Sequence, residues 1–143
     1  MQNFLSFVVG DVIRLPAGDG RVGFVDARDI AAVAVEALTT SGHEGRAHEL
    51  TGPEALSHSD VANQLSAATG RSILYENISP EIYEQEKTAQ GWPRASIDTL
   101  LALFADIRAG TNHDSTLTNT VERVTGRPPF NFRTFARHYA AKF

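Results

Sequence analysis

One stretch of the sequence constrains the fold more than any other. A short β-branched run at 21–25 leads into a segment at 30–38 made almost wholly of small apolar residues. Asp26 and Asp29 stand where carboxylates cap the free N–H groups of a helix start. A strand that feeds an Ala-rich helix is typical of the βα units of a mainly parallel sheet. Within the predicted helix the apolar positions recur at helical spacing and predict a core-facing stripe, at 30, 33, 34, 37 and 38.

The rest of the chain predicts two more short strands, at 48–51 and 72–76, and several helices. The apolar spacing over 1–9 predicts a first helix. The pattern as a whole predicts an α/β fold, with a partial Rossmann-type parallel sheet of about three short strands and a mostly helical C-terminal lobe. Three strands are too few for a fully covered parallel sheet, so residues 1–51 resemble part of a larger structure. Further helix starts are predicted at Ser57, Ser79, Trp92-Pro93, Asn119 and Asn131.

Composition excludes several classes of function. A formal charge of -4 over 143 residues, with no block of Lys or Arg, gives no electrostatic reason to expect nucleic acid or anionic lipid as a partner. The lack of cysteine excludes disulfides, thiolate nucleophiles and Cys-ligated metals and favours a cytoplasmic location. No run approaches the ~18 apolar residues of a membrane helix, and the N-terminus does not resemble a signal peptide.

Aromatic residues surround the helix break at Gly91. Tyr83 and Lys87 match the Tyr-x-x-x-Lys pair in which an ammonium lowers the pKa of a phenol for proton transfer. The same spacing occurs on any amphipathic helix, so a partly exposed helix face is the default interpretation. Trp92 and Tyr83 are candidates to line a substrate cleft, and core packing is the alternative.

Other motifs favour structural interpretations. Gly18-Asp-Gly20 is followed by a predicted strand, whereas a phosphate cradle needs a helix N-terminus directly after it, so we expect a tight turn. Ser57-His58-Ser59-Asp60 contains the residue types of a hydrolytic triad but occupies a helix cap. We therefore predict no catalytic residue and no metal site, because ligand spacing is also lacking among the histidines at 43, 48, 58, 113 and 138.

Four segments, in order and spacing, carry a resemblance to a known family: Met1-Gln-Asn-Phe4, the stretch from Leu15 to Ala32, Glu49-Leu-Thr-Gly-Pro-Glu54 and Thr125-Gly-Arg-Pro-Pro129. With these segments the chain resembles the C-terminal half of NmrA-like atypical short-chain dehydrogenases. The branch it resembles most is that of the NAD(P)H-dependent quinone oxidoreductases and azoreductases. The resemblance extends over essentially all 143 residues.

The resemblance implies a division of the chain and a set of site residues. Residues 1–51 match the last portion of a Rossmann domain, and residues 52–143 match the helical lobe that closes the substrate cleft. Asn3 and Phe4 match the segment that approaches the nicotinamide end of the cofactor. The loop that contains Pro16 and Gly18 matches the edge of the cleft, and Trp92, with Tyr83 nearby, falls in the lobe that faces it.

The sequence departs from the family in one large respect. A Rossmann domain holds the pyrophosphate with a Gly-x-x-Gly-x-x-Gly turn after its first strand, and this chain contains no such turn. The resemblance therefore implies that the nucleotide-binding half is absent and that the chain is a fragment or a truncated form. NAD(P) is therefore the cofactor of the full-length family, and we expect no tight binding of it to this chain alone. The uncovered faces predict a homo-oligomer.

The function implied by the resemblance is NAD(P)H-dependent reduction of a quinone-like or azo acceptor, a small molecule that the full-length form would bind. In that chemistry the cofactor supplies the reactive atom and the protein positions the acceptor. Two alternatives stay open. One is a non-catalytic NmrA-like redox sensor or regulator that binds a partner protein, and the other is a self-associating structural remnant without a ligand.

Overall fold

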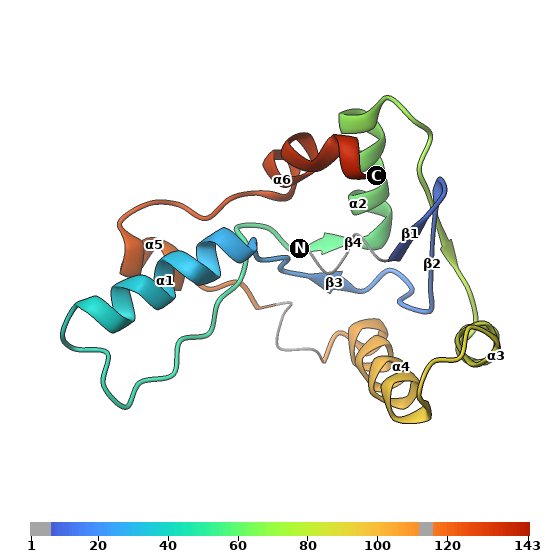
Figure 1. Cartoon of the computed structure of the whole chain (residues 1–143), viewed down its shortest axis with the longest axis horizontal. Coiled ribbons are helices and arrows are strands. Elements are labelled where there is room, and N and C mark those ends of the chain that lie inside the picture. The colour runs from blue at the N-terminus through green and yellow to red at the C-terminus, as the bar shows by residue number, and fades with distance from the viewer. Residues whose placement is uncertain (1–6, 112–115) are drawn as a thin grey trace.

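The computed structural model describes residues 7–111 and 116–143 of the chain (Figure 1). Its five short strands are β1 (Val8–Val9), β2 (Val12–Leu15), β3 (Arg21–Val22), β4 (Leu56–Ser57) and β5 (Leu74–Asn77). Its helices are α1 (Ala27–Thr39), α2 (His58–Thr69), α3 (Pro80–Ala89), α4 (Arg94–Ala109), α5 (Thr120–Thr125) and α6 (Phe132–Tyr139), and a 3-10 turn, η3 (Ala140–Lys142), follows α6.

The strands form two small sheets. In the first, the order is β1-β2-β5, with β1 antiparallel to β2 and β2 parallel to β5. In the second, β3 pairs antiparallel with β4. The predicted fold class, an α/β chain with a partial sheet and a mostly helical C-terminal part, is confirmed. Among the described strands, β2 and β5 are the pair that runs parallel.

The core lies between the first sheet and the helices that follow it. Along β2, Ile13 and Leu15 are buried and Arg14 is exposed, so one face of the strand meets the core. Helix α2 packs on β4, β5 and α6, α3 packs on α4, and α1 packs on α5. Figure 1 shows α1 and α5 together at one end of the molecule and the β1-β2-β5 sheet with α3 at the other.

Local sequence signals set most helix ends. The Asp26 side chain accepts from the Arg28 N–H at 2.9 Å and caps α1, as predicted. Ser57 and Asp60 form a reciprocal capping box at α2. The predicted caps at α3 and α6 are also confirmed. Asn119 precedes α5 but makes no side-chain capping bond, so that part of the prediction is wrong.

Two sequence-based element assignments differ from the structure. The predicted helix over 1–9 lies mostly outside the described residues, and Val8–Val9 belong to a strand instead. The reason is the turn at Gly10, whose φ of 63° lets Val9 pair with Val12. The predicted strand at 48–51 is not in a ladder within the described residues. Gly52 N–H donates to the Gly23 carbonyl at 3.1 Å, and the Glu49 carbonyl accepts from the Thr118 hydroxyl at 3.1 Å, so single contacts take the place of a strand ladder.

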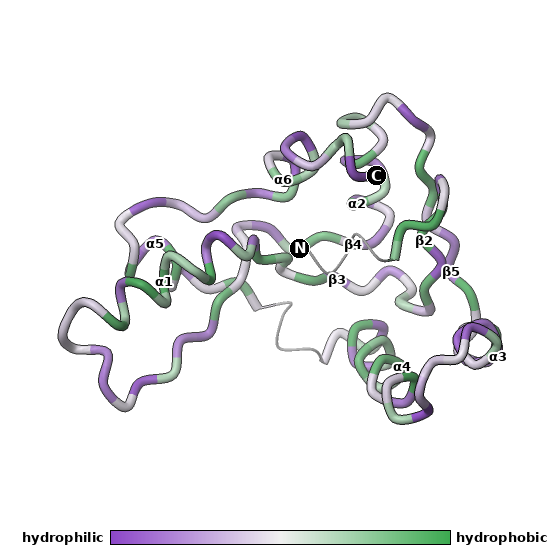
Figure 2. The backbone as a smooth tube through the Cα atoms, viewed as in Figure 1, coloured by the Kyte–Doolittle hydropathy of each residue, from purple (hydrophilic) through white to green (hydrophobic). Residues whose placement is uncertain are grey.

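The apolar stripe predicted on α1 is only partly buried. Val33 is 3% exposed and belongs to the core, whereas Ile30 is 45% exposed and Leu38 is 87% exposed. Val35, on the flank of the stripe, is 58% exposed. Hydrophobic residues recur along the α1 tube in Figure 2. The sequence correctly predicts an apolar helix, but the neighbour that the described chain provides, α5, covers only one side of it.

Candidate functional site

The loop after β2 contains two of the predicted site residues, Pro16 and Gly18. It is held from two sides. The Pro16 carbonyl accepts a hydrogen bond from the Arg108 guanidinium in the last turn of α4. On the other side, Gly18 N–H donates to Asn77 Oδ1 at 3.0 Å and Ala17 N–H donates to the Tyr75 hydroxyl at 3.2 Å. The loop is therefore fixed between α4 and β5.

The predicted tight turn at Gly18 to Gly20 is confirmed. Gly20 N–H donates to the Ala17 carbonyl at 3.3 Å, and Gly18 has a φ of 56°. A Cβ on Gly20 would lie 2.1 Å from the Ile107 carbonyl oxygen, so glycine is required by the approach of α4. No helix starts directly after the turn, since α1 begins at Ala27. Beside the turn is an open hollow of about 530 Å³, lined by residues 18–21 and 107–110.

Tyr83 and Trp92, two further predicted site residues, both contact one cation. The Lys87 ammonium lies 5.5 Å from the centre of the Tyr83 ring and 5.0 Å from that of Trp92. Tyr83 is fully buried, with its ring edge-on to Phe104 at 5.4 Å. Trp92 is 37% exposed. The Tyr83, Lys87 and Trp92 side chains therefore form one cluster where α3 meets α4.

This geometry argues against proton transfer by Tyr83. Its hydroxyl is buried and has no hydrogen-bond partner among the described residues. Burial raises the pKa of the phenol, and Lys87 faces the ring rather than the oxygen. The structure thus favours packing over catalysis. The default interpretation, a partly exposed helix face, is wrong for Tyr83 because this residue points into the core.

The predicted site residues fall into two groups along α4. Pro16 and Gly18 contact the C-terminal turn of α4, and Trp92 lies just before its first residue. Because α4 has 16 residues, its two ends are about 24 Å apart. The structure therefore brings Tyr83 and Trp92 together and leaves the Pro16 loop at the other end. Asn3 and Phe4 lie outside the described residues.

A narrow groove between the hairpin of β1 and β2 and helix α3 adjoins Lys87. It measures about 170 Å³ and is lined by Phe7, Val9, Val12, Arg14, Glu86, Lys87 and Gln90. Arg14 pairs with Glu76 at 2.6 Å and with Glu86 at 2.9 Å, which neutralises its charge. The rest of the lining mixes apolar side chains with Lys87 and Gln90, and the Lys87 ammonium donates to Gln90 Oε1 at 3.2 Å.

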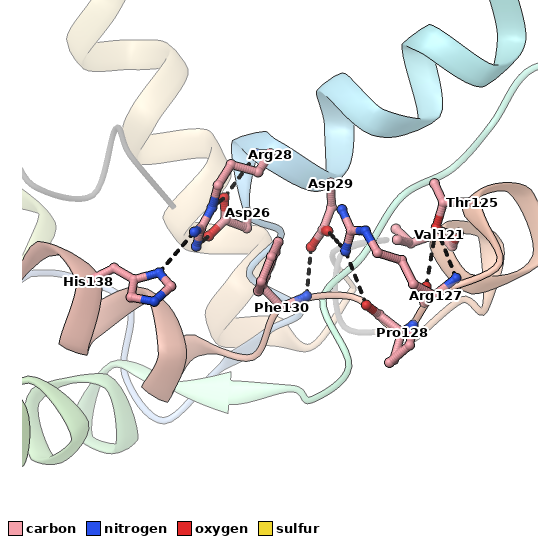
Figure 3. A network of polar contacts seen from close by, with 9 residues as sticks. All are labelled: Asp26, Arg28, Asp29, Val121, Thr125, Arg127, Pro128, Phe130 and His138. Carbon is pink, nitrogen blue, oxygen red and sulfur yellow. Dashed lines mark hydrogen bonds and ion pairs between the residues drawn. The ribbon is translucent and has the colours of Figure 1, made fainter.

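A buried polar network at the start of α1 is the feature that local sequence reasoning missed (Figure 3). Asp26 and Asp29 are both 0% exposed, and each meets an arginine. Arg28 Nη2 lies 2.7 Å from Asp26 Oδ2, and Arg127 Nη1 lies 2.7 Å from Asp29 Oδ1. The Phe130 N–H also donates to Asp29, at 2.8 Å.

The network holds the segment before α6 against the start of α1. The Phe130 ring lies under both guanidiniums, 4.1 Å from that of Arg28 and 4.8 Å from that of Arg127. Burial raises the pKa of Asp26, but the hydrogen bonds and charge of Arg28 lower it more, so the net pKa is below its usual value. The sequence drew attention to Asp26 and Asp29 as helix caps and to the Thr125 to Pro129 segment for its family resemblance, but to neither for an ion pair.

Metal and membrane sites are not supported where the structure is described. No group of three or more His, Asp or Glu side chains gathers there as a metal site would require. His43 Nδ1 and His48 Nε2 lie 3.0 Å apart, a proximity that ligand-spacing rules overlooked. In the same residues no helix combines the length and the apolar character needed to span a bilayer.

Comparison with known proteins gives consistent matches. The chain is 44% identical over 149 residues to an NAD(P)H azoreductase of Xenophilus azovorans, which covers 100% of this chain and 51% of that protein. The crystal structure of an NADPH-dependent quinone oxidoreductase of Escherichia coli superposes with a TM-score of 0.81 at 25% identity, covering 96% of this chain and 50% of that one. A triphenylmethane reductase of Citrobacter sp. has the same fold, with a TM-score of 0.79 at 20% identity over 99% of this chain and 48% of that one. No family model matches the chain.

The matched relatives are nicotinamide-dependent reductases with an α/β fold. The chain is homologous to the C-terminal half of the NmrA-like atypical short-chain dehydrogenases, as the resemblance implied. It spans about half the length of the relatives it matches.

Proposed function

We propose that the chain forms the acceptor side of an NAD(P)H-dependent reductase of quinone-like or azo compounds. The observation that carries this proposal is the 44% identity to an azoreductase over the whole of this chain. Since the sequence contains no Gly-x-x-Gly-x-x-Gly turn, the pyrophosphate would be gripped by a nucleotide-binding half that this sequence does not contain. In such enzymes the nicotinamide supplies the hydride, and the protein orients the acceptor.

The exposed apolar surface of α1 supports the assignment of the chain to two structural parts, a sheet-forming side and a lobe. We propose that residues 1–51 belong to the sheet-forming side and residues 52–143 to the lobe. Leu38 and Ile30 present apolar surface that would be buried against further strands. Thr51 is buried, yet residues 48–51 join no ladder within the described residues; a covering strand would supply partners for their backbone N–H and C=O groups.

The acceptor would lie against the surface formed by Trp92 and Lys87. A flat aromatic acceptor stacks on an indole ring, and the ammonium beside that ring attracts the electron density of a quinone or azo group. Tyr83 would support this surface from the core. Asn3 and Phe4 would lie toward the nicotinamide, and the loop with Pro16 and Gly18 would form the edge of the cleft, as the family resemblance implies. This arrangement needs no acid-base pair from the chain, in agreement with the buried Tyr83 hydroxyl.

A two-component assay tests the proposal. The chain is produced together with the nucleotide-binding half of the Xenophilus azovorans azoreductase, and NADPH oxidation is followed with a naphthoquinone or an azo dye. We expect acceptor-dependent oxidation only when both components are present. Formation of a stable complex without turnover would refute the reductase proposal and favour a sensor that binds dinucleotide without catalysis.

Variants test the position of the acceptor. We expect Trp92→Ala to raise the KM for the acceptor about ten-fold, the loss of roughly one stacking contact, with the KM for NADPH unchanged. Ile82→Ala is the matched control, because Ile82 is a similarly exposed apolar residue, at 43%, on α3. An equal KM in the two variants would remove Trp92 from the acceptor site.

The same exposed surface supports a proposal about assembly. In the absence of a covering half, the apolar face of α1 would pair with a second copy of the chain and give a homo-oligomer. Light scattering at micromolar concentration measures this directly. A monomer at all concentrations would contradict it.

A further inference from the structure

A groove between α2 and α6 lies outside every site considered above. The two helices pack together, and the space beside their contact measures about 470 Å³, which is within the range of pockets that hold small molecules. Its lining combines polar and charged side chains with two small alanines, which leaves room for a ligand beside the helices. The groove is lined by Asn63, Gln64, Ala67, Ala68, Arg133 and Arg137.

The two arginines of the groove have no acidic partner among residues 7–111 and 116–143. Arg133 and Arg137 are four residues apart on α6, and both side chains line the groove. In the described part of the chain, neither guanidinium makes a hydrogen bond or an ion pair, whereas those of Arg28 and Arg127 are each paired with a buried carboxylate near the start of α1. Like charges at this spacing repel each other, and an anion bound between them would offset that repulsion.

The local charge has the same sign over the whole of this region. The last 21 residues of the chain contain five Arg and Lys and no Asp or Glu, although the chain as a whole carries a net charge of -4. Positive charge is therefore concentrated on the segment that contains α6. A concave surface with one sign of charge raises the local concentration of ions of the opposite sign.

An unsatisfied amide in the opposite wall provides a further observation. Gln64 of α2 lines the groove, and its buried Oε1 atom has no hydrogen-bond partner among the described residues. A buried amide group without a partner costs free energy, so such groups are usually satisfied by a ligand or by water. Because the oxygen and nitrogen of a side-chain amide can exchange places by rotation, Gln64 can also present an N–H to an anion.

From these observations we propose that the α2–α6 groove binds a small molecule through a doubly charged oxyanion group, with Arg133 and Arg137 as its cationic partners and Gln64 as a hydrogen-bonding wall. Phosphoryl and dicarboxylate groups share this chemistry, since both offer several oxygens to the fork of a guanidinium. The small Ala67 and Ala68 side chains leave room for the rest of the ligand. The inference does not rest on the proposed reductase function, because it uses no residue of the acceptor site.

Binding is tested with two probes, inorganic phosphate and succinate, by isothermal titration calorimetry in a low-salt buffer free of both anions. We expect saturable binding of at least one probe, with a dissociation constant of about 1 mM, and weaker binding in ~0.5 M NaCl. The tighter probe identifies the group as phosphoryl or dicarboxylate. Failure of both probes to saturate at ~50 mM would overturn the proposal.

Matched variants distinguish binding in the groove from a general attraction of anions to positive surface charge. The double variant Arg133→Gln and Arg137→Gln is expected to weaken binding at least ten-fold, as for the loss of about one charge-assisted hydrogen bond. The control, Arg46→Gln with Arg123→Gln, removes the same charge from two exposed arginines outside the groove and is expected to change binding less than about two-fold. Equal weakening in both double variants would overturn the proposal.

A third variant tests the groove without changing its charge. Ala67 is exposed on the groove side of α2, so Ala67→Leu fills the space and leaves both guanidiniums in place. We expect it to weaken binding as well, with the circular dichroism spectrum of the folded protein retained. Unchanged binding in Ala67→Leu would contradict a ligand seated in the groove.

Discussion

The buried His58 makes the stability of this protein depend on pH in a window where few other groups titrate. Its side chain is 3% exposed at the first position of α2, between the rings of Phe24 at 5.9 Å and Tyr75 at 5.5 Å. Burial lowers the pKa of His58 from 6.5 to about 4. The positive N-terminal end of α2 opposes protonation in the same direction.

The lowered pKa of His58 determines whether stability rises or falls with pH. Above pH 6.5 the imidazole is neutral in both the folded and the unfolded chain, so His58 adds no pH dependence. As the pH falls below 6.5, the unfolded chain binds a proton that the folded chain does not bind, and stability is lost until the folded pKa of about 4 is reached. With these values the free energy of unfolding falls by about 2 kcal/mol between pH 7.5 and pH 5, and by roughly 3 kcal/mol in total.

Urea denaturation at a series of pH values from 7.5 to 5 measures this loss. The variant His58→Phe keeps an aromatic ring at the position and cannot bind a proton, so its free energy of unfolding should be nearly flat over that range. The control Ile82→Ala, at an exposed apolar residue of α3, should keep the slope of the wild type. A flat wild-type profile, or an unchanged slope in His58→Phe, would refute the reasoning.

Two other predictions concern the polar network and the α1 surface. Asp29→Ala leaves the Arg127 guanidinium and the Phe130 N–H without their buried acceptor, so we expect a loss of roughly 2–4 kcal/mol in urea denaturation, less than for a fully buried pair because Arg127 is 39% exposed. A loss below ~0.5 kcal/mol would show that water replaces the carboxylate. Leu38→Glu changes a side chain that is 87% exposed, so we expect it to abolish self-association and leave the unfolding midpoint unchanged. Light scattering of an unchanged oligomer would place the contact elsewhere.

Local features of this fold are predictable from sequence because their physical causes are local. The caps at Asp26 and Ser57 satisfy N–H groups within three residues, and the turn at Gly18 is set by backbone freedom. Periodicity identifies which residues of α1 are apolar but carries no information on what covers them. For the same reason the segment 48–51 has the composition of a strand and yet forms no ladder in the described structure, since pairing needs a neighbour.

The candidate site was predictable only in part, because some of its contacts are tertiary. Local spacing brings Lys87 to Tyr83 and Trp92, but the burial of Tyr83 against Phe104 needs the packing of α3 against α4. Asp29 and Arg127 are 98 positions apart, beyond the reach of any local pattern. A cleft shared by the Pro16 loop and Trp92 stays a prediction.

The central claim is that the dinucleotide is gripped by a half of the enzyme that this sequence lacks. Titration of the purified chain with NADPH, followed by the fluorescence of the nicotinamide ring, tests it most directly. The account predicts no saturable enhancement up to ~100 µM, because the chain offers no glycine-rich turn at a helix N-terminus for the pyrophosphate. Saturable enhancement with a low-micromolar dissociation constant would contradict the account.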